Sequence, residues 1–146
     1  MRRVVHSAGL FLVCVTLALI QLTPTARAGD PKADAQVVIA SQIEAFLADD
    51  MEAAYGFAAP SIRSVYPDVA RFAEMVRKGY GPVYRPGNFA FGRGETTADR
   101  SRVIQEVLIS GPDGKDWTAL YLLDRQPDGS WKIAGVRMLK SALPQT

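Results

Sequence analysis

Two chemically versatile side chains are almost absent from this sequence. Among 146 residues there is one histidine, His6, and one cysteine, Cys14. Long hydrophobic runs are scarce as well, because the uncharged apolar run at residues 8–20 is shorter than the roughly 20 residues that a membrane-spanning helix needs. We therefore expect no stable membrane anchor.

The N-terminal segment has the features of a secretory signal peptide. Arg2 and Arg3 precede the apolar run, and residues 26–28 read Ala-Arg-Ala, the small-residue pattern that signal peptidase cleaves. We predict cleavage after Ala28, which makes residues 1–28 a signal peptide and residues 29–146 a single domain, periplasmic or secreted.

The exported chain then contains no histidine and no cysteine. This excludes Ser-His-Asp and Cys-His catalysis, zinc or copper sites built from imidazole and thiolate, and disulfide bonds. Loss of Arg2, Arg3 and Arg27 also takes the formal net charge from +2 to about −1. No nucleic-acid partner is expected, since the excess of positive charge lies in the discarded segment.

The first half of the exported chain has the spacing of helices. Asp30-Pro31 is typical of a helix start, and apolar residues recur at helical intervals over 39–47, which predicts a first helix that ends near Asp49. Asp49 and Glu52 have the spacing of a capping pair and predict a short second helix that stops before Pro60. A third helix is predicted from residues 67–68 to Gly79.

The second half alternates between apolar and polar residues. Residues 80–87, which contain Pro82 and Pro86, are expected to be extended rather than helical. Strands are expected around 89–91, 103–109, 117–124 and 131–139, with a polar turn region after Gly92 and Gly94 and hairpin turns at 112–114 and 127–129. The predicted fold is α+β, with three N-terminal helices packed on a curved antiparallel sheet.

Several segments together resemble a known family. They read SQIEAFLADD at 41–50, AYGFAAPSIR at 54–63, PVYRP at 82–86, WTALY at 117–121 and DGSWKIAG at 128–135. This combination resembles the domain-of-unknown-function family 4864, whose small exported bacterial members are similar to the nuclear-transport-factor-2-like superfamily. The resemblance implies a cystatin-like cone that can enclose a pocket, and it implies no activity and no catalytic residue.

A proton-transfer enzyme is one hypothesis for such a pocket. Without histidine, its base must be an Asp, Glu, Lys or Tyr in a dry site. Asp49 and Asp50 are the candidate carboxylates, and Tyr55 is a candidate phenolic donor. An Asp pair at a helix junction is more often a helix cap, and this interpretation is preferred. No metal or cofactor is expected.

A binding site for a small apolar or aromatic ligand is the favoured hypothesis. Tyrosine rings bury apolar area and offer a polar tip, and a neighbouring arginine can receive a carboxylate or phosphate. The candidate ligand-binding residues of this kind are Tyr55, Tyr80, Tyr84, Arg85 and Tyr121.

Gln105 is the sixth candidate, because it is in phase with the apolar Val103 and Val107. An amide on a buried face needs hydrogen-bond partners. We expect it to tie the sheet to residues 80–86, and the alternative is a pocket group.

Three functions follow, in order of preference. The first is a non-catalytic exported module that binds a small ligand or a periplasmic protein, the second is a cofactor-free isomerase-like or dehydratase-like enzyme, and the third is a scaffold that dimerises through its sheet face. A closed pocket with a buried carboxylate favours the enzyme, an open or apolar pocket the binding module, and a filled cone the scaffold.

Overall fold

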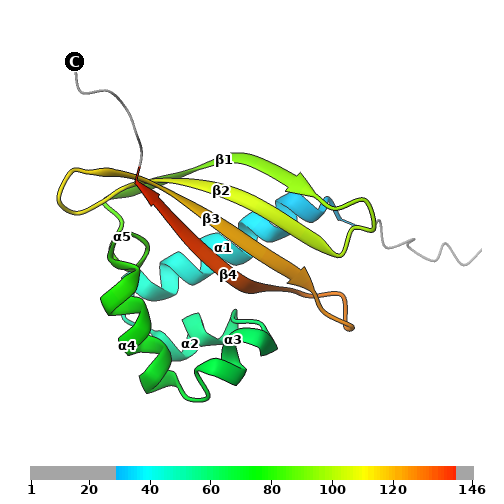
Figure 1. Cartoon of the computed structure of the whole chain (residues 1–146), viewed down its shortest axis with the longest axis horizontal. Coiled ribbons are helices and arrows are strands. Elements are labelled where there is room, and N and C mark those ends of the chain that lie inside the picture. Colours follow the sequence, from blue (N-terminus) through cyan, green and yellow to red (C-terminus); the bar gives the residue numbers. More distant parts are fainter. Residues whose placement is uncertain (1–28, 141–146) are drawn as a thin grey trace, which may run out of the picture.

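A computed structural model describes residues 29–140 as a four-stranded antiparallel sheet with helices on one side of it (Figure 1). The helices are α1 (Pro31–Leu47), α2 (Met51–Gly56), α3 (Pro60–Val65), α4 (Val69–Gly79) and α5 (Gly81–Tyr84). The strands are β1 (Asn88–Thr96), β2 (Arg102–Ser110), β3 (Asp116–Arg125) and β4 (Trp131–Lys140). The fold class is α+β, as predicted, whereas the predicted signal peptide, His6 and Cys14 lie outside the described residues.

Helix α1 forms where the sequence predicts it. Asp30 caps its N-terminus by accepting a hydrogen bond from the backbone of Lys32 at 3.1 Å, and Pro31 occupies the first turn. The helix ends at Leu47, and Asp49 then adopts a φ of +57°, in the left-handed region that breaks helical geometry. The predicted end near Asp49 is therefore two residues late.

The helical half contains more elements than the three predicted helices. Asp50, rather than Asp49, caps α2, since its Oδ1 accepts from the backbone of Ala53 at 2.9 Å. Helix α2 stops before Pro60, as predicted. Pro60 itself occupies the first turn of a further helix, α3, which was not predicted. The third predicted helix is α4, capped by Asp68.

The prediction that residues 80–87 contain no helix is wrong. Residues 81–84 form the short helix α5, in which Pro82 sits in the first turn. A proline there has no intrahelical hydrogen bond to lose, so the ring does not prevent one turn of helix.

The sheet is a meander with strand order β1-β2-β3-β4. Gly114 and Gly129, in the two predicted hairpin turns, have φ of +74° and +86°, which other residues rarely adopt. The polar turn expected after Gly92 and Gly94 lies at residues 97–101, and β1 runs through both glycines, with a register shift between Phe91 and Gly94. This bulge lets the strand continue through both glycines.

The hydrophobic core lies between the helices and the inner face of the sheet, and α1 runs beneath the strands (Figure 1). In β2 the buried residues alternate with more exposed ones, so that Val103, Gln105, Val107 and Ile109 point inward. Ile104 and Leu108, on the outer face, are 42% and 47% exposed. No helix within residues 29–140 is long and apolar enough to cross a membrane.

Candidate functional site

A pocket of about 180 Å³, open to solvent on one side, lies between the helices and the edge strand β4. Its lining residues come from α1, α3, α4, α5 and β4, together with Tyr66 after α3 and Tyr80 between α4 and α5. Its lining residues are Gln42, Phe46, Ile62, Tyr66, Phe72, Met75, Val76, Tyr80, Val83, Ile133, Gly135 and Val136.

The wall of this pocket is aromatic and aliphatic. Phe46 and Phe72 stack with ring centroids 6.3 Å apart, and both side chains are buried. None of the described lining residues is an Asp, Glu, Lys or Arg. The pocket therefore offers packing surface and a few neutral polar atoms, but no carboxylate base.

Gln42 is the most buried polar side chain of the pocket, at 4% exposure. It lies one turn before Phe46 on α1, and its Nε2 donates to the carbonyl oxygen of Ala54 at 3.1 Å. A carbonyl only accepts, so this bond fixes the nitrogen toward α2 and leaves the amide oxygen directed elsewhere.

Tyr80 is the one predicted ligand-binding residue that lines this pocket. Its hydroxyl donates to the carbonyl oxygen of Val136 on β4 at 3.2 Å. This bond ties the end of α4 to the edge strand and orients the phenol along the pocket wall.

Asp49, Tyr84 and Arg85 meet outside the pocket, in one polar cluster. Tyr84 Oη donates to Asp49 Oδ1 at 2.7 Å, and the Arg85 guanidinium pairs with the same carboxylate. Arg85 also donates to the carbonyl oxygen of Phe46 and stacks over the Tyr84 ring at 4.2 Å. Hydrogen bonds from Tyr84, and next from Arg85, hold the pKa of Asp49 below its ordinary value. All three residues were candidates for a functional site, and in the structure they bind one another rather than line the pocket.

Tyr55 and Asp50 lie on α2 and at its start. The Tyr55 hydroxyl donates to the backbone oxygen of Tyr66 at 2.7 Å, and its ring packs on Phe72 and under Arg63. Asp50 is exposed and caps α2. The structure therefore places the two candidate carboxylates, Asp49 and Asp50, on the surface.

Gln105 is a tie, as expected, but the expected partner is wrong. Its Nε2 lies 3.1 Å from the oxygen of Gly92 and 3.2 Å from that of Arg93, and Gln36 donates to its Oε1 at 3.1 Å. The amide thus connects the β1 bulge to α1, and no bond to residues 80–86 is present among the described contacts. The bulge turns these carbonyls toward the core, where they need donors.

Tyr121 is fully buried in the middle of β3, opposite Gln105 and Val136. Its hydroxyl has no hydrogen-bond partner among the described residues, and burial raises its pKa above the ordinary value. It belongs to the hydrophobic core and does not line the pocket.

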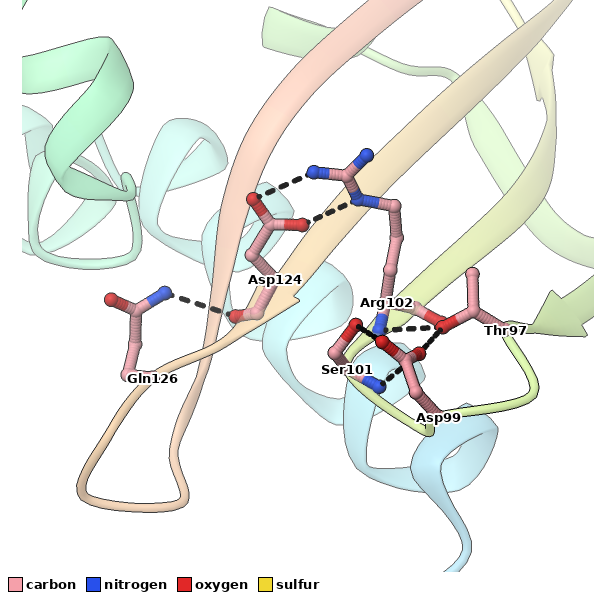
Figure 2. A network of polar contacts seen from close by, with 6 residues as sticks. All are labelled: Thr97, Asp99, Ser101, Arg102, Asp124 and Gln126. Atoms are coloured by element: carbon pink, nitrogen blue, oxygen red, sulfur yellow. Dashed lines mark hydrogen bonds and ion pairs between the residues drawn. The ribbon is translucent and has the colours of Figure 1, made fainter.

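A second polar network lies at the β1–β2 turn and the adjacent end of β3 (Figure 2). Arg102 on β2 pairs with Asp124 on β3 through Nε and Oδ1 at 2.7 Å. Hydrogen bonds from the hydroxyls of Thr97 and Ser101 lower the pKa of Asp99 to about 2. Because these carboxylates are used within the β1–β2 turn and between strands, the network stabilises the hairpins.

Most residues of the pocket wall could not be predicted from the sequence. Gln42 could have been noticed, because it lies three residues after Ile39 and four before Phe46, on the apolar stripe of α1. Ile62, Met75 and Val136 carried no such signal. Within residues 29–140, no group of three His, Cys, Asp or Glu side chains is placed to hold a metal ion.

The fold and the pocket define a small α+β protein whose helices cover one face of an antiparallel meander and leave an apolar pocket at its edge. The family model described as "Domain of unknown function (DUF4864)" matches residues 29–146, and the chain belongs to this family. No curated protein and no solved structure gave a significant match.

Proposed function

We propose that this protein binds a small, uncharged, apolar ligand in the pocket and performs no chemistry on it. The observation that carries the proposal is the open pocket of about 180 Å³ with its aromatic and aliphatic wall. Small-molecule sites are mostly apolar, with a few placed polar groups. An apolar cavity of about 150 Å³ holds one benzene molecule, so this volume suits a single ring or a short chain.

The alternative of a proton-transfer enzyme has less support. Asp49 and Asp50 are exposed, and each carboxylate accepts hydrogen bonds that stabilise local structure. A base of this kind needs a drier position beside the reacting atom.

Thermal unfolding in the presence of toluene tests the binding proposal. At ten times its dissociation constant, a ligand that binds only the folded state stabilises it by about 1.4 kcal/mol, a rise of several degrees in Tm. Met75→Trp places a larger side chain in the pocket wall and should abolish the rise. Val37→Trp, at a position on α1 that is 66% exposed, is the matched control and should retain it. No rise for the natural chain, or an equal rise for Met75→Trp, contradicts the proposal.

We also propose that the protein is exported and that its leader is removed after Ala28. The family match, which begins at residue 29, supports a boundary at that position. Intact mass spectrometry of the protein recovered from the periplasm of an expressing bacterium should give a chain that starts at Gly29. A periplasmic chain that retains residues 1–28 contradicts cleavage, and absence of the protein from the periplasm contradicts export.

A second copy of this chain is the partner that the outer sheet face favours. Leu108 on β2 and Leu139 on β4 are 47% and 41% exposed there. At the level of Leu120 on β3, Glu106 lies on one side and Arg137 on the other. A two-fold axis along β3 sets β2 of one copy against β4 of the other, so that Glu106 faces the arginine of the second copy.

A charge exchange tests this association. Light scattering after gel filtration should give a dimer for the natural chain and a monomer for Glu106→Arg or Arg137→Glu, because each creates a like-charge contact. The double variant should restore the dimer. A monomeric natural chain, or single variants that remain dimeric, would overturn this arrangement.

A further inference from the structure

We infer that the amide oxygen of Gln42 anchors a hydrogen-bond donor of the ligand, so that the pocket takes a neutral single-ring or short-chain molecule with an O–H or N–H group. This inference rests on the proposed ligand-binding function and adds the chemical class of the ligand.

The first step is the burial of the amide. Gln42 is 4% exposed and lies among the aromatic and aliphatic residues of the pocket wall. A side-chain amide has two N–H donors and an oxygen with two lone pairs, and the hydrogen bond to Ala54 uses one of the donors. Such a group in a ligand pocket therefore has hydrogen-bonding capacity to offer a ligand.

The second step is the orientation of the amide. Its nitrogen faces the carbonyl oxygen of Ala54, to which it donates at 3.1 Å. Among the hydrogen bonds of residues 29–140, none has the Gln42 oxygen as its acceptor. The carbonyl oxygen of Gln42 is therefore available to accept a hydrogen bond from a ligand, and it cannot donate one.

The third step concerns the Tyr80 hydroxyl on the same wall. Its proton is directed to the carbonyl oxygen of Val136 at 3.2 Å, so the phenolic oxygen also offers lone pairs to the pocket. The oxygens of Gln42 and Tyr80 favour a ligand that donates a hydrogen bond, and the absence of charged side chains from the described lining residues favours a ligand without charge.

The volume of the pocket limits the size of the ligand. A volume of about 180 Å³ accommodates one six-membered ring with a small substituent. Phenol fits this description, whereas toluene has almost the same shape and lacks the donor. The pair therefore separates the hydrogen bond from the packing.

Calorimetric titration of phenol and toluene into the natural chain and into Gln42→Met tests the inference. Methionine has a similar length and no amide, so it preserves packing. The natural chain should bind phenol at least as tightly as toluene, although phenol loses more hydration. In Gln42→Met the ratio of the dissociation constant of phenol to that of toluene should rise about tenfold. Phenol loses one hydrogen bond, which contributes roughly that factor to affinity, whereas toluene loses none.

The outcomes separate the two proposals. If neither ligand binds the natural chain, both proposals are overturned. If toluene binds and Gln42→Met leaves the ratio unchanged, the pocket binds ligands but the anchor is overturned. Should Gln42→Met fail to fold, the side-chain NH₂ resonances of Gln42 in the natural chain decide the question by NMR, because phenol should shift them more than toluene does, and equal shifts refute the anchor.

Discussion

Replacement of Tyr121 by phenylalanine should stabilise the protein. The Tyr121 side chain is fully buried, and its hydroxyl has no hydrogen-bond partner among the described residues. A buried polar group without a partner costs about 1–3 kcal/mol. Removal of one oxygen leaves at most about 15 Å³ of space, which costs roughly 0.4 kcal/mol at about 24 cal/mol per Å³. The expected net gain in the free energy of unfolding is about 1 kcal/mol.

The stability of the protein at alkaline pH provides a second, independent test of the burial of Tyr121. Burial raises the pKa of Tyr121 in the folded state, whereas in the unfolded chain the phenol ionises near pH 10. Above that pH the unfolded state binds fewer protons than the folded state, so stability falls by about 1.4 kcal/mol per pH unit from this residue. Tyr121→Phe should remove this part of the decline.

Urea unfolding followed by far-UV circular dichroism at pH 7 and at pH 10–11 measures both effects. Tyr55→Phe is the matched control, because it removes a hydroxyl that donates to Tyr66 at 2.7 Å and should lower stability by about 1 kcal/mol. A loss of 1 kcal/mol or more for Tyr121→Phe at pH 7 would refute the reasoning, since it requires a partner for the hydroxyl. An unchanged alkaline decline would refute the effect of burial.

Three further predictions concern the polar ties. Gly94→Ala should lower the free energy of unfolding by about 1–3 kcal/mol in urea titrations, because the new Cβ would lie 2.5 Å from Gln105 Oε1; Gln105→Ala should relieve much of this penalty, and a fully additive double variant contradicts it. Tyr84→Phe should raise the pKa of Asp49 toward its ordinary value in an NMR titration, and the stability that depends on the low pKa is present at neutral pH and lost as the pH falls; an unchanged pKa contradicts this assignment. Asp68→Ala should cost about 1 kcal/mol by removing the α4 cap, and no loss in thermal unfolding contradicts that role.

Elements with strong local signals could be predicted from the sequence. The alternation in β2 and the glycines at 114 and 129 predict a meander, because each strand and each turn is specified within a few residues. The short helices α3 and α5 could not be predicted in this way. One turn of helix has little intrinsic stability, so tertiary contacts decide whether a proline begins it or interrupts an extended segment.

The candidate site depended more on tertiary structure. The alternation of β2 correctly indicated that Gln105 is buried, but its partners lie in a bulge created by the register between β1 and β2. The pocket combines Gln42, Met75 and Val136 from three elements that are distant in sequence. Met75 and Val136 look like ordinary core residues in the sequence, and only the arrangement of all three residues leaves a space between them.

The polar residues that stood out in the sequence act on the pocket from behind its wall. Tyr80 and Val83 line the pocket, whereas Arg85 lies outside it and donates to the carbonyl oxygen of Phe46, which also accepts from the backbone of Asp49 at 3.1 Å. Since the ring of Phe46 lines the pocket, Arg85 links the segment that carries Val83 to the helix that carries Phe46. A change at Arg85 would alter ligand affinity without any contact between the two, and it would affect phenol and toluene alike. A change at Gln42 should instead affect the two ligands differently, and this difference identifies a residue that touches the ligand.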